Sequence, residues 1–175
     1  MPNSVQFVTS SGVGRLIFFN TDESQVEGVE AMNIATIPKL GKRWKVVFDL
    51  KTAEYTPSND EAILTLTEGT KMYCRVIISL NTAVLLTNVN DEMTFMESSH
   101  QFKIGEWNTI QMTHDEGAEG GRFFVSLSIG DKELGKLDVG SLEQRNEFTN
   151  VQLRLSVDWF PAPMFIGRLL VIEKC

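Results

Sequence analysis

The chain has 175 residues, of which 42% are apolar and 22% are charged, a composition that suits one folded domain and argues against a disordered chain. The net charge is -7, from 23 acidic and 16 basic residues, and no Lys/Arg cluster is present, which argues against nucleic acid as a partner. No run of about 18 apolar residues occurs, so no membrane span is predicted. We expect a single domain over residues 1–175.

Most of the chain alternates between apolar and polar residues, the pattern of strands with one buried and one solvated face. The clearest cases are the segments 44–51, 123–129 and 151–158, which are expected to contribute to a shared apolar layer. In chain order, strands are predicted over residues 5–9, 15–19, 44–51, 62–67, 72–80, 83–89, 93–96, 107–114, 123–129, 132–137, 151–158 and 168–173. About a dozen short strands at this spacing predict an all-β sandwich or barrel.

Short connections between these segments favour antiparallel neighbours. Gly130-Asp131 suits a two-residue type II′ hairpin turn, because its first position requires a positive φ. Asn81-Thr82 is expected to join its two flanking strands in the same way. Only residues 141–145 suggest a helical turn, with Ser141 as its cap.

The two cysteines, Cys74 and Cys175, are too few to hold a metal without other ligands. They can pair, since a terminal strand can lie beside a central one, and the possible disulfide is one expectation. The alternative is a buried free Cys74 and an unpaired terminal Cys175.

One stretch goes beyond generic strand patterning: Gly105, Glu106 and Trp107 are followed by a small polar residue and an aliphatic one, then by an alternating strand and a tight turn. Together with the blocks 37–50 and 167–172, this stretch resembles the concanavalin A-like lectin/glucanase superfamily, and within it the laminin-G-like, pentraxin-like and galectin-like domains. The resemblance is strongest over residues 31–174. It implies a jelly roll, a two-sheet antiparallel β-sandwich, and a role in glycan or protein recognition outside the cell.

The residues of the known activities in this superfamily are only partly present. His100 and His114 do not sit in the His-x-Asn-x-Arg run of galectins, and His114, which ends a predicted strand, is expected to be solvated. A glucanase needs paired carboxylates across a cleft, and no predicted strand presents that pattern. A pair of Cys74 with either histidine requires long-range folding. We therefore expect no enzyme activity.

Calcium is a possible cofactor, as in pentraxin-like and many laminin-G-like domains. The oxygen-rich run of Asn88, Asn90, Asp91 and Glu92 is the best candidate site, and residues 58–61 are a second one. The alternative interpretation is an ordinary turn, because Asn and Asp bond their own backbone there.

The segment 159–165 is the most unusual in the chain, because two prolines keep it out of a central strand. Trp159 and Phe160 can form a platform for a sugar or a partner, with Arg154, Gln152 and Asp158 supplying polar contacts. The alternative is that these aromatics cover one end of the sandwich.

The hypothesis is a non-catalytic, lectin-like recognition module that binds glycan. A protein–protein adhesion or assembly module, including a homo-oligomer, is the second hypothesis, and a glycoside hydrolase is a remote third. The family resemblance implies an extracellular or secreted protein, with the cytoplasm left open as the alternative.

Overall fold

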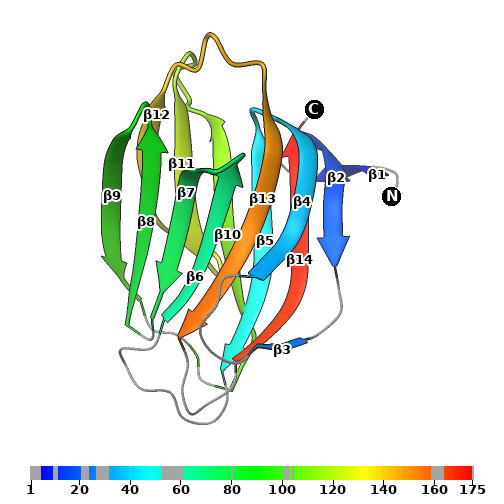
Figure 1. Cartoon of the computed structure of the whole chain (residues 1–175), viewed down its shortest axis with the longest axis vertical. Coiled ribbons are helices and arrows are strands. Elements are labelled where there is room, and N and C mark those ends of the chain that lie inside the picture. Colours follow the sequence, from blue (N-terminus) through cyan, green and yellow to red (C-terminus); the bar gives the residue numbers. More distant parts are fainter. Residues whose placement is uncertain are drawn as a thin grey trace.

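The protein is an antiparallel β-sandwich of two sheets, as Figure 1 shows for a computed structural model of the chain. The structure describes residues 5–9, 12–20, 24–26, 32–52, 61–79, 81–100, 103, 105–158 and 164–174. No helix occurs among these residues, so none of them forms a helix that is long and apolar enough to cross a membrane. The predicted all-β sandwich is confirmed.

The larger sheet has eight strands and lies behind the smaller one in Figure 1. Its order is β1-β2-β14-β5-β10-β11-β12, with the short β3 beside β14. The strands are β1 (Val5–Thr9), β2 (Gly12–Asn20), β3 (Ser24–Val26), β5 (Trp44–Thr52), β10 (Asn108–Glu116), β11 (Phe123–Ile129), β12 (Lys132–Gly140) and β14 (Met164–Lys174).

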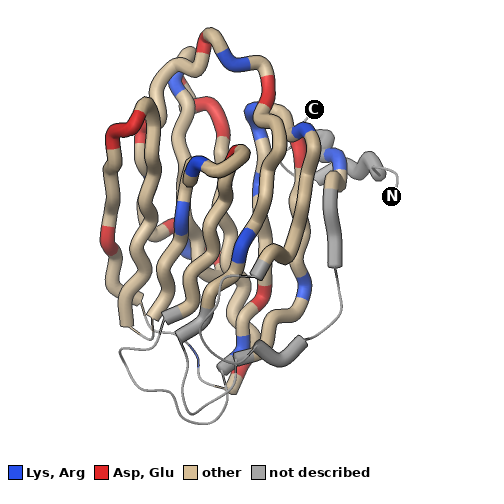
Figure 2. Tube along the Cα trace, viewed as in Figure 1, with Lys and Arg blue, Asp and Glu red and all other residues tan. Residues whose placement is uncertain are grey.

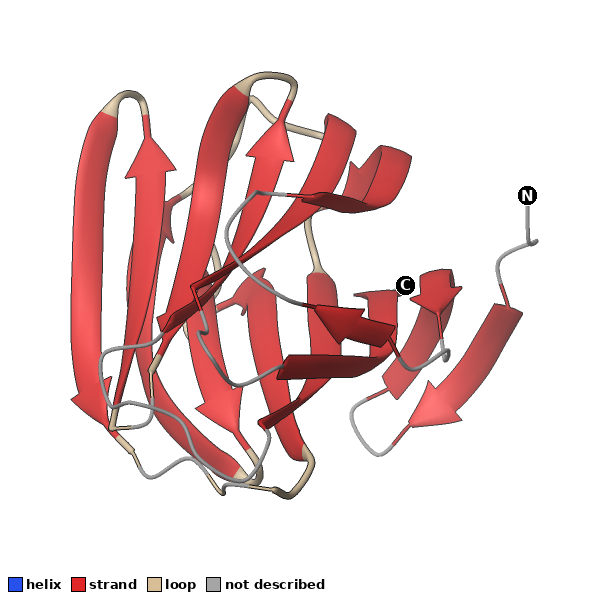
Figure 3. Ribbon diagram, turned by 60° about the horizontal axis from the view of Figure 1, so that its bottom comes forward, coloured by secondary structure: helices blue, strands red, loops and turns tan. Residues whose placement is uncertain are grey.

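The smaller sheet has six strands in the order β4-β13-β6-β7-β8-β9. Its strands are β4 (Met32–Gly41), β6 (Glu61–Glu68), β7 (Lys71–Ile78), β8 (Thr82–Val89), β9 (Glu92–Ser99) and β13 (Glu147–Asp158). Strands β6 to β9 follow one another through hairpins, whereas β13 arrives from the other sheet and inserts between β4 and β6. Figure 3 shows the two sheets from below as separate layers.

The core lies between the two sheets and is filled by every second residue of the central strands, as the alternation predicts. Burial of one such Val, Leu or Phe side chain contributes about 1.5–3 kcal/mol. Strands β5 and β11 turn their apolar faces toward that of β13 across the gap between the sheets. The buried residues of these three strands are Trp44, Val46, Val47, Phe48, Leu50, Phe123, Val125, Leu127, Phe148, Val151, Leu153 and Leu155.

Two strands were not predicted from the sequence: the short β3 and the ten-residue β4. The family resemblance compares residues 37–50 with a single opening strand, but Lys42 and Arg43 form a bend that separates β4 from β5, and the two strands belong to different sheets. Pro38 lies within β4, which is possible because β4 is an edge strand and its proline removes no essential ladder bond.

The turn predictions fared unevenly. Gly130 has φ 59° and Asp131 has a negative φ, as a type II′ turn requires. The hairpin near Asn81 is shifted by one residue, because Thr82 already belongs to β8 and its carbonyl accepts from the Ser79 amide. Residues 141–145 form a single turn and no helix, since Leu142 has φ 54°, which lies outside the helical region.

Candidate functional site

The outward face of the six-stranded sheet carries a continuous row of side chains, one from each strand. They point away from the core because their neighbours along each strand, such as Leu64, Leu153 and Val76, are buried. From β4 to β9, the paired residues of the row are Asn33, Arg154, Thr65, Arg75, Leu86 and Phe95. Five strand spacings make the row about 24 Å long.

Polar groups occupy the centre of this row. The Arg75 Nε donates a hydrogen bond to the Thr65 hydroxyl at 3.0 Å, which draws its guanidinium toward β6 and thus toward β13. Arg75 is half-buried, whereas Arg154 on the far side of Thr65 is exposed. The Thr65 side chain is itself buried, so the two arginines present the accessible donors.

An exposed apolar patch lies at the β9 end of the same face. Phe95 is 68% exposed and Met93 is 53% exposed, and they pair across the ladder with Leu86 and Asn88 of β8. Large apolar side chains that are this open on an edge strand lose hydrophobic stabilisation, so they indicate a contact surface. The face therefore combines guanidinium donors with an aromatic side chain.

Two of the five residues predicted to bind ligand have described side chains, Gln152 and Arg154, and both lie on this face. Gln152 pairs with Thr67 and Thr36, one row above Arg154. Asp158 ends β13 opposite Glu61, and its side chain is outside the described ones. Trp159 and Phe160 lie outside the described residues, so their part in a binding platform stays a prediction.

The proposed calcium ligands form a tight hairpin between β8 and β9. Asn90 and Asp91 are its two central residues, with φ 51° and 63°, the conformation of a type I′ turn. Asp91 lies 3.9 Å from the Lys71 ammonium, and Glu92 is exposed. Among the described residues, no group of three or more His, Cys, Asp or Glu side chains is placed to hold a metal. Residues 58–60 of the second candidate lie outside the described ranges.

Cys74 is fully buried on β7 and is a free thiol, and Cys175 lies outside the described residues. The structure therefore contains no described partner for the disulfide predicted between Cys74 and Cys175. Burial raises the pKa of the Cys74 thiol, because the apolar core disfavours the thiolate.

The burial of Cys74 predicts that its thiol does not react in the folded protein. In a Cys175→Ser variant, which keeps Cys74 alone, we expect no reaction with a disulfide reagent such as DTNB at pH 8 and one equivalent after unfolding in guanidinium. Modification of the folded variant at the rate of a free thiol would contradict the burial of β7.

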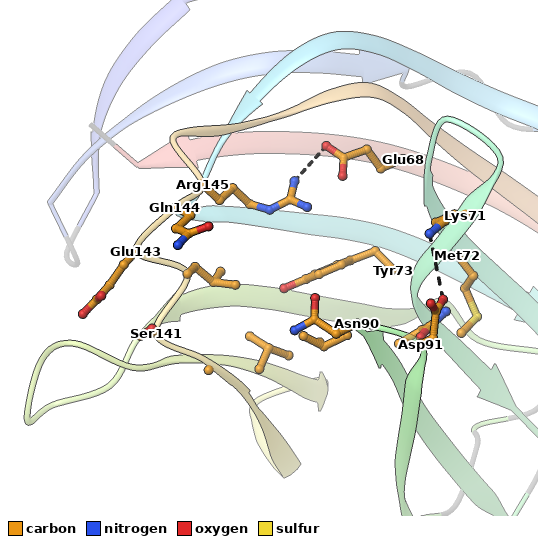
Figure 4. A pocket seen from close by; sticks show the side chains of 15 residues that line it. Glu68, Lys71, Met72, Tyr73, Asn90, Asp91, Ser141, Glu143, Gln144 and Arg145 are labelled. Atoms are coloured by element: carbon orange, nitrogen blue, oxygen red, sulfur yellow. Dashed lines mark hydrogen bonds and ion pairs between the residues drawn. The ribbon is translucent and has the colours of Figure 1, made fainter.

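A pocket of about 700 Å³ opens at the end of the sandwich, beneath the connection from β12 to β13 (Figure 4). Four of its five charged groups form two ion pairs: Arg145 lies 2.8 Å from Glu68, and Lys71 faces Asp91. Burial acts to raise the pKa of Glu68, but the hydrogen bonds from Arg145 and from the Thr149 amide outweigh it and hold the pKa below its ordinary value. The pocket is thus a polar end of the core.

Beside this pocket lies an aromatic cluster around His114. We expected this side chain to be solvated, but it is fully buried, so that prediction was wrong. Its ring stacks between Trp44, at 5.1 Å and 9°, and Phe123, at 5.5 Å and 24°. The Lys42 carbonyl can only accept, so the His114 Nδ1 carries the proton and the Nε2 accepts from the Tyr73 hydroxyl at 2.8 Å.

The environment of His114 keeps the ring neutral. Burial lowers its pKa to about 4, although the hydrogen bond to the Lys42 carbonyl acts in the opposite direction. Because both ring nitrogens are engaged, His114 cannot take a proton from Cys74 without losing a hydrogen bond. Phe148 of β13 completes the cluster with an edge contact to His114 at 5.3 Å. The sequence does not reveal this cluster, because its five members come from five different strands and only their aromatic character is visible.

A second exposed aromatic group lies on the outer face of the eight-stranded sheet. Lys51 places its Nζ 4.8 Å from the Trp107 ring centroid and 5.1 Å from that of Phe165. Trp107 is 37% exposed, and its ring lies over Gly167, where a Cβ would approach it to 3.0 Å. Lys51 already occupies the space between the two rings, so this group is less open than Phe95.

No family model matches the sequence, and no curated protein is similar to it. Solved structures with a similar fold include the receptor-binding domain of botulinum neurotoxin type G, with a TM-score of 0.57 and 14% identity. That match covers 98% of this chain and 43% of the toxin chain, so this chain spans less than half of the toxin domain.

Two further similar structures match nearly along their whole length. A galectin from Caenorhabditis elegans has a TM-score of 0.52 and 10% identity, over 85% of this chain and 94% of its own. The CBM40 domain of the IT-sialidase from Ruminococcus gnavus, bound to α2,3-sialyllactose, has a TM-score of 0.55 and 14% identity, over 89% and 91%. At these identities the similarity establishes a galectin-like sandwich fold.

Proposed function

We propose that the protein is a non-catalytic recognition module that binds a glycan on the outward face of the six-stranded sheet. The row from Arg154 to Phe95 carries this proposal, because guanidinium donors and an exposed aromatic ring are the two contacts that a sugar needs, for its hydroxyls and its apolar face. The structural similarity to the CBM40 domain, which is bound to α2,3-sialyllactose, supports a glycan as the ligand. An extracellular location follows from this proposal.

The part of the face around Arg75 lacks the carboxylate pair of a glycosidase. Hydrolysis by the usual mechanism needs two carboxylates across a cleft. In the row of Arg75 and in the adjacent row of Ile77, Glu97 is the only acidic residue among the described side chains. These two rows therefore offer one carboxylate where that chemistry needs two.

The proposal is tested by a glycan array, probed with calcium and with a chelator. We expect binding by the native protein and about tenfold weaker binding by Phe95→Ala, which loses a stacking surface at little cost to the fold because the ring is 68% exposed. Trp107→Ala, on the opposite sheet, is the control and should bind as the native protein does. A blank array under both conditions, or loss of binding only in Trp107→Ala, would contradict the proposal.

The exposed patch of Met93 and Phe95 supports one second candidate, an adhesion or assembly module. Both residues lie on β9, the edge strand of the sheet, whose free ladder groups can pair with another chain. Light scattering coupled to size exclusion separates the two: a dimer that Phe95→Ala converts to a monomer supports assembly, and a monomer at all concentrations counts against self-assembly.

A further inference from the structure

The arginines of this acidic protein are distributed unevenly between paired and unpaired positions. Five of the seven form an ion pair with a carboxylate in the structure: Arg15, Arg43, Arg122, Arg145 and Arg168. Among the described side chains, no carboxylate forms an ion pair with Arg75 or Arg154, and Arg75 donates a hydrogen bond to Thr65 instead. A chain with 23 acidic residues could supply partners for both, so the two unpaired guanidinium groups are notable.

Arg75 and Arg154 are also neighbours in space. Each pairs with Thr65, one from β7 and the other from β13, so the two backbones lie two strand spacings, or about 10 Å, apart. The hydrogen bond to Thr65 uses the Arg75 Nε and leaves its terminal N–H groups available on the side of Arg154. Arginine side chains are long enough for both heads to reach one anion above β6.

The surrounding charges leave this position positive. Glu97 lies on the same face, but on β9, two strands from Arg75 and one row away. Asp158 of β13 pairs with Glu61 of β6, and each is four residues from the Arg154–Thr65 pair, about 13 Å along the strands. In Figure 2 the acidic segments of the six-stranded sheet lie at its upper end and along β9, away from the middle of β7 and β13. Two like charges held side by side favour an anion between them.

We infer that this face selects an anionic sugar, with Arg75 and Arg154 holding its carboxylate or sulfate group. The inference rests on the proposed function and specifies the ligand class. Guanidinium groups bind such oxyanions through paired, charge-assisted hydrogen bonds. Phe95 lies two strands beyond Arg75 in the same row, so an oligosaccharide places its anionic residue over Thr65 and an apolar sugar face on the ring.

The test uses three probes that share one neutral core: lactose, 3′-sialyllactose and 3′-sulfolactose. By calorimetry, we expect at least one of the two anionic probes to bind about tenfold or more tightly than lactose, and to weaken as salt rises. The preferred probe distinguishes a carboxylate from a sulfate as the natural group. Arg75→Gln and Arg154→Gln should each weaken binding of that probe about tenfold and weaken lactose less, so that the preference for the anionic probe falls.

Arg122→Gln is the matched control, since it removes the same charge from an exposed pair with Asp138 on the other sheet. It should bind all three probes as the native protein does, and thermal unfolding should show that the Arg75 and Arg154 variants remain folded. Equal affinity for lactose and both anionic probes, or equal loss in the control, overturns the inference while the proposed function stands. A protein that binds none of the three overturns the inference, and the glycan array then decides the proposed function separately.

Discussion

Acidification from pH 7 to pH 4 is expected to remove about 3 kcal/mol of stability through His114 alone. The pKa of this group is 6.5 in an unfolded chain and about 4 in the folded protein. Between these values the unfolded state binds more protons than the folded one, so the free energy of unfolding falls as the pH falls. The contribution is complete above pH 6.5 and is lost progressively down to about pH 4.

The fold has no place for a second proton on this ring. The His114 Nε2 already accepts a hydrogen bond from the Tyr73 hydroxyl. In an imidazolium this nitrogen would carry a proton, and its N–H would point at the hydroxyl hydrogen of Tyr73. Trp44 and Phe123 cover the two faces of the ring and exclude water from the charge. Arg145 adds an unfavourable positive charge nearby. The histidine therefore charges only when the cluster opens.

Urea unfolding at pH 7.5, 6, 5 and 4 measures this effect. His114→Phe keeps an aromatic ring but has no titrating group. Its free energy of unfolding at pH 7.5 should be lower than that of the native protein, because Tyr73 loses its hydrogen-bond acceptor. Between pH 7.5 and pH 4, however, this free energy should fall by about 3 kcal/mol less than it does in the native protein. Acidic groups such as Glu68 contribute equally to both proteins and cancel in the comparison. Parallel curves for the native protein and His114→Phe would show that His114 is not the titrating group.

The part of the fold that the sequence predicts well is the part with strict alternation. Strand β11 matches its predicted bounds, and β5 and β13 contain theirs, because one buried and one wet face leave a period of two in the residues. Edge strand β4 was hidden for the opposite reason: its Pro38 and its half-exposed position weaken the pattern. The expectation that His114 is solvated was wrong because a polar residue at the end of a predicted strand gives no sign of the Phe148 and Trp44 rings that cover it.

The candidate site was only half predictable. Alternation along β13 places Gln152 and Arg154 on the outer face, and the structure agrees. Their neighbours Thr65 and Arg75 come from β6 and β7, 89 and 79 residues before Arg154, and they become its neighbours only because β13 inserts beside β6. Long-range strand order of this kind leaves no local trace in a single sequence, because loop closure and sheet pairing are decided by the whole fold.

Replacement of Phe148 by Ala should cost about 3–5 kcal/mol of stability, a large share of what a domain of this size possesses. The Phe148 ring is fully buried and makes edge contacts with three other rings: Tyr73 at 4.8 Å, His114 at 5.3 Å and Trp44 at 6.3 Å. Arg145 covers it from the pocket side at 4.3 Å. The loss combines the transfer energy of the ring with a cavity that its rigid, stacked neighbours cannot fill.

Phe95→Ala supplies the matched comparison, because the same atoms are removed from a side chain that is 68% exposed. Its unfolding free energy should stay within about 0.5 kcal/mol of the native value, as measured in urea at pH 7.5. Similar losses at the two positions would mean either that the cluster around Phe148 collapses without a cavity or that Phe95 is covered, for example in an oligomer. A protein concentration series separates these outcomes, because only the second makes the cost of Phe95→Ala depend on concentration.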